Sequence, residues 1–354
     1  MIGLAIGSQL PRGLSTILVE THSKFGQETS SRNSEVIHSG IYYPEKSKKT
    51  ELCIRGKKIL YQFCKEAGIG FGRIGKIVVG NDEKDEEYLT RLVSHVQNLG
   101  IPHEELSETQ IREKEPLIRG LKGVFFPESG IINSHELMER LERNLKDAGV
   151  HLAYRHSVKK IEKEGNSWRV SVESPDETFF ILPRVIINAA GLGAAHLSNL
   201  ALQTNRYEHR FCRGRYLSLA PQFQGKFKHL IYPVPVKDGV GIHITLDTES
   251  AVRLGPDVDW CESATEKIYD CDWEFLKDSF LPPVNRYCPS IKREHLSPAL
   301  IGIRPKLFID KVAYPDFLVE NQDGFIHCLG IESPGLTASL AIAEEVKTLV
   351  EETL

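Results

Sequence analysis

The sequence predicts an α/β fold, α+β overall, in which a discontinuous Rossmann-like dinucleotide-binding domain carries an inserted mixed-sheet domain. Strand and helix patterns typical of a parallel sheet occur at the start, near the middle and at the end of the 354 residues. Two blocks of mixed character separate them. We expect residues 1–45, 133–200 and 297–354 to form the dinucleotide-binding domain, and residues 46–132 and 201–296 to form the substrate domain.

The opening segments predict half of a βαβ unit. The pattern from Ile2 to Leu10 indicates a helix that stops near Pro11, and Ser15 to Glu20 indicates a buried strand. Of the G-x-G-x-x-G turn that such a unit uses to hold a pyrophosphate, only the last glycine, Gly3, has a matching place. Glu20 follows it at close to the ~20-residue offset at which an acid binds ribose hydroxyls.

The remaining elements follow from periodicity and turn residues. A capping signal at Ser134 indicates the start of a helix. Residues Val150–Leu182 have the pattern of short antiparallel strands. Strands dominate Phe211–Leu254, with bends at Pro233, Pro235 and Gly239. The other expected helices are Glu51–Ala67, Glu83–Asn98, Glu262–Leu281 and Leu336–Val350, and the other expected strands are Lys76–Val79, Val185–Asn188 and Phe325–Leu329.

Composition excludes several classes of protein. A formal net charge of −4 gives no sign of a nucleic-acid partner. The seven cysteines are scattered and never spaced as C-x-x-C, which argues against a disulfide framework and a zinc site. No apolar run approaches the ~18 residues of a membrane span, which leaves peripheral association as the only expected membrane contact, and no targeting segment is visible.

Two segments are suited to holding a polar ligand. The stretch from Thr29 to Pro44 crowds Arg32, His38 and two tyrosines into a loop with little helix or strand pattern. Near the end of the chain, the stretch from Phe325 to Ser339 runs from strand through a glycine loop into a helix, whose first amides suit an electron-rich ring edge.

These segments together resemble the D-amino-acid oxidase-like flavoprotein superfamily, and within it the L-2-hydroxyglutarate dehydrogenase family. The matching stretches, which extend over essentially the whole chain, are SSRNSEVIHSGIYYP, Asn188–Gly191, Gly241–Thr245, Gly302–Lys306 and GIESPGLTASLAIAEEV. The resemblance implies FAD and oxidation of L-2-hydroxyglutarate to 2-oxoglutarate by hydride transfer from C2 to the flavin. The family's first strand and first two fingerprint glycines would precede Met1, so we expect the first strand of the unit to be absent.

The resemblance also implies which residues hold the cofactor. Ser30, Ser31, Arg32 and Asn33 would lie beneath the isoalloxazine, and Val158 resembles the strand residue whose backbone contacts adenine. The full implied set is Gly3, Glu20, Ser30, Ser31, Arg32, Asn33, Val158, Ala190, Gly191, Gly330, Gly335, Leu336 and Thr337.

The chemistry requires a base for the hydroxyl proton and cations for two carboxylates. Histidine suits the first role, and His38 and His243 are the two candidates. His243 alternates with Ile242 and Ile244 on a strand, so we expect it to point opposite to them. Arg304 resembles the superfamily arginine that grips the α-carboxylate, for which a bidentate fork is suited. The distal carboxylate could be received by Lys306, Arg213 or Arg215, and Tyr43 and Tyr216 are candidate hydroxyl donors.

Two alternatives remain open. An amine or amino-acid oxidase of the same fold would use the same arginine and flavin loops, and an inactive truncated flavoprotein would explain the missing first strand. The expected partners are a small dicarboxylate and an electron acceptor that no short motif identifies. The family suggests a mitochondrial location if the source is eukaryotic, and a cytoplasmic one otherwise.

Overall fold

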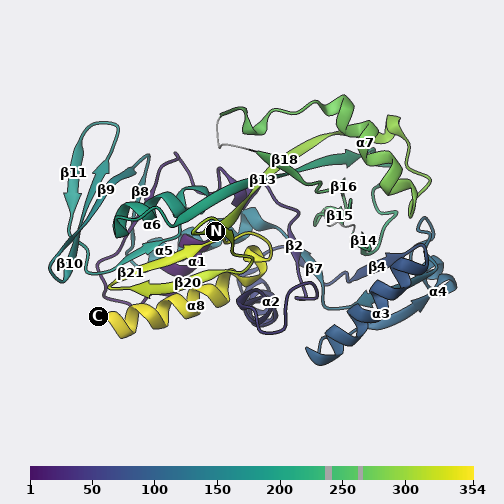
Figure 1. Cartoon of the computed structure of the whole chain (residues 1–354), viewed down its shortest axis with the longest axis horizontal. Helices are drawn as coiled ribbons and strands as arrows, with labels where there is room; N and C mark the ends of the chain where they lie inside the picture. The colour runs from purple at the N-terminus through teal and green to yellow at the C-terminus, as the bar shows by residue number, and fades with distance from the viewer. Residues whose placement is uncertain (236–240, 262–265) are drawn as a thin grey trace.

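The computed structural model describes residues 1–235, 241–261 and 266–354. Figure 1 shows an elongated molecule with two regions of different construction. One contains helices α1, α2, α5 and α8 around short sheets, and the other contains a large sheet with α3, α4 and α7. The long strands β13 (Tyr207–Leu219) and β18 (Leu296–Ile309) pair antiparallel and run between the two regions.

Parallel pairing joins segments that are far apart in the sequence, as the predicted fold class requires. Strand β1 (Ile17–Glu20) pairs with β8 (His151–Tyr154). Strand β12 (Ile186–Asn188) pairs parallel with β21 (Phe325–Leu329), which pairs antiparallel with β20 (Leu318–Gln322). Within the described residues these two parallel pairs belong to separate sheets.

Helices from both ends of the chain cover these sheets and share one hydrophobic core. Helix α2 crosses α8 so closely that a Cβ on Gly56 would lie 2.5 Å from the Thr337 carbonyl oxygen, so glycine is required there. Ser47 caps α2 by accepting a hydrogen bond from the Thr50 amide, and Gly68 ends it with φ of 69°. The helices of this region are α1 (Ile2–Gly7), α2 (Lys48–Ala67), α5 (Ser134–Asp147), α6 (Ala194–Leu202) and α8 (Gly335–Thr353).

The large sheet has the order β19-β18-β13-β16-β15-β14-β4-β6-β5, with β17 paired to β13. Only β14 and β4 pair parallel among these strands as described. Beyond β13 and β18, its strands are β4 (Lys76–Gly80), β5 (Glu104–Ser107), β6 (Lys122–Phe126), β14 (Leu230–Pro233), β15 (Ile244–Leu246), β16 (Val252–Leu254), β17 (Asp259–Cys261) and β19 (Val312–Ala313). The helices beside it are α3 (Glu83–Asn98), α4 (Glu108–Lys114) and α7 (Trp273–Asn285).

Two small antiparallel sheets complete the fold. One has the order β2-β7-β3, formed by β2 (Val36–Ile37), β3 (Phe71–Gly72) and β7 (Gly130–Ile132). The other has the order β11-β10-β9, formed by β9 (Ser157–Glu164), β10 (Ser167–Glu173) and β11 (Thr178–Ile181).

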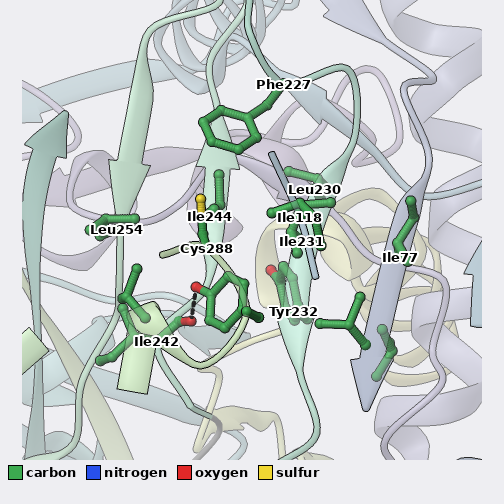
Figure 2. Close-up of a cluster of buried hydrophobic side chains, with 14 of the residues drawn as sticks. Ile77, Ile118, Phe227, Leu230, Ile231, Tyr232, Ile242, Ile244, Leu254 and Cys288 are labelled. Atoms are coloured by element: carbon green, nitrogen blue, oxygen red, sulfur yellow. Dashed lines mark hydrogen bonds between the residues drawn. The ribbon is translucent and has the colours of Figure 1, made fainter. Parts of the chain in front are cut away.

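The strands of the large sheet contribute to a second hydrophobic core, part of which is drawn in Figure 2. Ile77 on β4, Leu230 and Ile231 on β14, and Ile244 on β15 are fully buried in it. The Tyr287 hydroxyl donates a 2.6 Å hydrogen bond to the Ile242 carbonyl. This bond fixes the backbone immediately before His243.

The structure confirms most of the expected elements, corrects three of them and adds one. Asn133, not Ser134, caps α5, because its side chain accepts from the His135 and Glu136 amides. The Val150–Leu182 segment is antiparallel only from β9 onward, since β8 pairs parallel with β1. Within Glu262–Leu281 the helix begins at Trp273 and extends through Pro282 and Pro283, while residues 262–265 and the bend expected at Gly239 lie outside the described residues. Strand β18, which contains Pro298 and Pro305, was not predicted.

Among the helices of the described segments, none combines the length and the apolar character that crossing a membrane requires.

Candidate active site

A cavity of about 350 Å³ opens where the two regions meet. Its wall is formed by the Thr29–Tyr43 loop, by the end of β14 and the start of β15, by the middle of β18, and by the loop before α8. Twelve of the predicted site residues line it: Ser30, Arg32, Asn33, His38, Tyr43, Gly191, Tyr216, His243, Arg304, Lys306, Gly335 and Leu336. The two segments that the sequence singled out therefore face one another across this space.

The other predicted residues do not line the cavity. Gly3 lies in α1, where a Cβ would meet the Ala189 Cβ at 3.7 Å, an ordinary van der Waals distance. Glu20 ends β1 and accepts a 2.9 Å hydrogen bond from the His22 amide. Val158 lies on β9 opposite Val172. The remainder lie close to the wall without lining it: Ser31, Ala190, Gly330 and Thr337.

The start of α8 borders the cavity, and the Gly335 amide there donates to the Glu332 carbonyl. Gly335 and Leu336 line the wall, and no side chain caps this helix end. A helix of 19 residues has a partial positive charge at its uncapped N-terminus, which suits an electron-rich or anionic group. On the opposite side Arg32 lines the cavity, and its buried Nε has no hydrogen-bond partner within the described part of the chain.

Both ring nitrogens of His38 contact a polar side chain. Its Nε2 lies 3.3 Å from the Ser333 hydroxyl, and its Nδ1 lies 3.5 Å from Nζ of Lys76. Its backbone amide donates to the Thr337 hydroxyl at 3.0 Å, which ties the loop to α8. Burial, followed by the charges of Lys76 and His243, holds the pKa of His38 well below its usual value. A neutral imidazole at neutral pH can accept a proton.

Lys76 was missed by the sequence reasoning. It begins strand β4, is 0% exposed, and places its ammonium 4.0 Å from the centroid of the Tyr232 ring. Burial lowers the pKa of Lys76 to about 7. The sequence offered only one signal for it, a lysine at the first position of an otherwise apolar strand.

His243 stacks on Tyr232, with ring centroids 3.5 Å apart and an interplanar angle of 15°. The residues on either side of it, Ile242 and Ile244, enter the hydrophobic core, while His243 faces the cavity. The alternation expected from the sequence is therefore present in the structure.

Arg304 lies in the middle of β18 and is oriented by backbone carbonyls. Its Nη2 donates to the carbonyls of Arg213, at 2.8 Å, and Asp257, at 2.7 Å. No carboxylate lies within ion-pair distance of Arg304 among the described residues. Its charge is thus available to a ligand carboxylate.

Arg213 and Arg215 have carboxylate partners of their own. Arg213 pairs with Asp259, and Arg215 with Asp257 and Asp259. Neither arginine lines the cavity.

Lys306 belongs to a three-residue charge cluster at the cavity wall. Glu332 receives Lys49 at 2.9 Å and Lys306 at 2.7 Å, so the cluster carries one positive charge in excess. Burial would raise the pKa of Glu332, but the two ammonium groups outweigh it and hold that pKa below its usual value. Tyr43 extends beside this cluster, with its hydroxyl 3.5 Å from the Ser333 hydroxyl.

Comparison with known proteins identifies relatives along the whole chain. The family model described as FAD dependent oxidoreductase matches residues 1–349. The chain is 32% identical to a mitochondrial L-2-hydroxyglutarate dehydrogenase of Arabidopsis thaliana, over 98% of this chain and 80% of that protein. It is 26% identical to the L-2-hydroxyglutarate dehydrogenase of Escherichia coli K12, over 94% of this chain and 86% of that protein.

Solved structures share the fold. The L-α-glycerophosphate oxidase of Mycoplasma pneumoniae, with FAD bound, superposes with a TM-score of 0.87 at 23% identity, covering 99% of this chain and 92% of that chain. Glycine oxidase from Bacillus cereus superposes with a TM-score of 0.79 at 17% identity, covering 100% of this chain and 93% of that chain.

Proposed function

Because the chain belongs to the D-amino-acid oxidase-like FAD-dependent oxidoreductases and, within them, to the L-2-hydroxyglutarate dehydrogenase family, we propose that it oxidises L-2-hydroxyglutarate to 2-oxoglutarate. The observation that carries this proposal is the meeting of Arg304, which has no carboxylate partner among the described residues, and a neutral histidine, His38, in one cavity.

The residues present fit a bound FAD. The uncapped start of α8, the unpartnered Nε of Arg32 and the glycine turn at Gly191 all face or border the same cavity. We propose that Ser30, Asn33 and Leu336 border the ring, while Gly3, Glu20 and Val158 serve the remainder of the cofactor. Bound FAD supplies the ring that accepts the hydride from C2.

The protein's own residues would bind the substrate, orient it and remove the proton of its hydroxyl group. We propose that Arg304 binds the α-carboxylate through Nη1, because its Nε and Nη2 already donate to backbone carbonyls. The net positive charge of the cluster formed by Lys49, Glu332 and Lys306 then receives the distal carboxylate, with Tyr43 as a hydroxyl donor beside it. Tyr216, buried at the cavity wall, completes the pocket.

His38 is the proposed base, because its Nε2 lies beside Ser333 at the cavity while its Nδ1 contacts Nζ of Lys76. When the substrate hydroxyl loses its proton to Nε2, the hydride can leave C2. His243 would instead line the cavity and orient Tyr232 and the substrate, because one face of its ring stacks on the tyrosine ring.

The proposed organisation assigns residues 1–45, 133–200 and 297–354 to the FAD-binding domain, with the rest forming the substrate domain and α2 packing back onto α8. The Arabidopsis relative is named as mitochondrial, and a eukaryotic source would place this chain there too. The electron acceptor is a partner still to be identified.

A substrate panel tests the proposal. Reduction of an artificial acceptor should require L-2-hydroxyglutarate and should be at least tenfold slower with the D-enantiomer. C2 carries a single hydrogen, and in the D-enantiomer it would point away from the flavin when both carboxylates are bound. Rapid peroxide formation with glycine or sarcosine, and none with L-2-hydroxyglutarate, would show an amine oxidase instead.

A further inference from the structure

Lys76 is a buried cation whose neighbours provide no opposite charge. It lies in β4 between Leu230 of β14 and Phe126 of β6, with its side chain directed toward His38, Tyr42 and Tyr232. Within the described ranges, no carboxylate lies within ion-pair distance of its Nζ. A structural lysine in such a place would normally be paired, because an isolated buried charge is costly.

The groups around Lys76 stay uncharged near neutral pH. Burial raises the pKa of Cys53 on α2 to about 12, and burial likewise raises the pKa of Tyr42 and of Tyr232. His38 and, across the cavity, His243 are the remaining titratable groups that face this site. Burial lowers the pKa of Lys76 to about 7, so its charge changes near neutral pH.

The contact between Lys76 and His38 ties that proton to the tautomer of the imidazole. An ammonium at Nζ can only donate, so it requires a lone pair on Nδ1 and leaves the ring proton on Nε2. An uncharged amine can accept, so the ring proton moves to Nδ1 and Nε2 presents its lone pair to the cavity. Only the second arrangement lets Nε2 take a proton.

We propose that Lys76 is the positioning residue that sets the tautomer of His38 and receives its Nδ1 proton during oxidation. This inference rests on the proposed function. In the step, the substrate O–H bond breaks and an Nε2–H bond forms, while the Nδ1–H bond breaks and an Nζ–H bond forms. The O–H electron pair becomes the second C–O bond, and the C2–H pair leaves as hydride to FAD, so atoms and electrons balance.

The proposal predicts a tautomer switch that needs no turnover. In ¹⁵N-histidine-labelled protein, with His38→Asn used to assign the signals, Nδ1 of His38 should carry the proton at pH 8.5 and Nε2 should carry it at pH 5.5. Burial sets the midpoint near the pKa of Lys76, about 7. A tautomer that stays constant over this range in the wild-type protein would overturn the proposal.

Two substitutions at Lys76 separate its hydrogen bond to His38 from its titration. Lys76→Met removes both donor and acceptor, so kcat should fall roughly 10- to 100-fold with KM changed less than about threefold, and the acidic limb of the kcat profile near pH 7 should disappear. Lys76→Gln can accept from Nδ1 through its amide oxygen without titrating. The kcat of Lys76→Gln should be roughly tenfold higher than that of Lys76→Met, and its pH profile should also lack the acidic limb near pH 7.

Lys57→Met is the matched control, because Lys57 is equally buried but pairs with Glu128. It should leave the tautomer switch and the pH profile unchanged. An unchanged kcat and pH profile in Lys76→Met would contradict the proposal. A wild-type enzyme that shows the switch but does not oxidise L-2-hydroxyglutarate would refute the proposed substrate while supporting the Lys76–His38 coupling.

Discussion

Arg304 donates a 2.8 Å hydrogen bond to the backbone carbonyl of Arg213, while the guanidinium of Arg213 turns away to Asp259. The two arginines lie on adjacent strands, β18 and β13, yet they have different electrostatic roles. Arg213 is neutralised by its partner, whereas Arg304 is fixed by neutral carbonyls and keeps its charge. This contrast identifies which arginine of the sheet is available to a substrate carboxylate.

Replacing Arg304 by Lys should therefore raise KM for L-2-hydroxyglutarate by roughly 10- to 100-fold, since one ammonium group cannot keep the carbonyl bonds that orient Arg304 and also donate to the carboxylate. Steady-state kinetics with an artificial acceptor would measure this. Arg210→Lys is the control, because Arg210 is on β13 but pairs with Glu208 at the surface. Equal KM values for wild type and Arg304→Lys would remove the assignment.

Replacing His38 by Asn should lower kcat by roughly 10²- to 10⁴-fold, the usual contribution of a positioned base. His243→Asn should cost less in kcat, because that ring stacks on Tyr232 and orients rather than deprotonates. Single-turnover flavin reduction would separate the two variants. If His243→Asn proved the slower of the two, the base would have to be reassigned to His243.

Lys76→Met should stabilise the fold at low pH. Burial lowers the pKa of Lys76 to about 7 in the folded protein, while the unfolded chain keeps a value near 10.5. Between these values the unfolded state binds the extra proton, so the burial cost is largest below pH 7 and fades as pH rises. The variant should gain about 2–4 kcal/mol of unfolding free energy at pH 6, and less at pH 9. Denaturant titrations at both pH values measure the difference, and a destabilised variant at pH 6 would contradict it.

Glu332→Gln should destabilise the protein by about 2–4 kcal/mol, because it leaves the buried Lys49 without its anion, beside the partly exposed Lys306. The pKa of Glu332 is depressed in the folded state, so its stabilisation is present above the unfolded pKa and is lost as pH falls through the folded value. The difference between wild type and variant should accordingly shrink on acidification below about pH 4. Thermal unfolding across pH 3–7 would measure this, and a pH-independent difference would argue against an ionised Glu332.

Gly302→Ala should disturb the polar loop. A Cβ at this position would lie 2.1 Å from the Arg32 carbonyl oxygen, so β18 and the loop would have to separate. We expect weaker retention of FAD, measured as the fraction of flavin bound after gel filtration. Gly193→Ala is the control, because nothing lies within 4 Å of its Cβ position. Equal flavin content in the two variants would show that the close approach is not required.

The sequence predicted the elements whose periodicity is strong and local. Helix α3 and strand β21 have the expected bounds, and the alternation around His243 placed its neighbours in the core. Strand β18 escaped prediction because prolines at 298 and 305 break the usual pattern. This strand forms because it pairs with β13 along most of its length, although its local strand propensity is weak.

The candidate site was predictable only in part, because electrostatic roles depend on long-range pairing. The family resemblance singled out Arg304, but no local pattern shows that Arg213 and Arg215 are paired, since their aspartate partners lie more than forty positions further along the chain. Lys76 likewise meets His38 only after β4 has paired in the large sheet. The polar loop and the glycine loop were recognisable because each concentrates its donors within one short stretch.

Anaerobic addition of L-2-hydroxyglutarate to the purified protein, followed by visible absorbance, tests the central claim most directly. A flavin spectrum that bleaches with this substrate, and not with the D-enantiomer or with glycine, is the predicted result. Protein that carries flavin but keeps its absorbance with L-2-hydroxyglutarate, while bleaching with an amine or another 2-hydroxy acid, would contradict the proposed function.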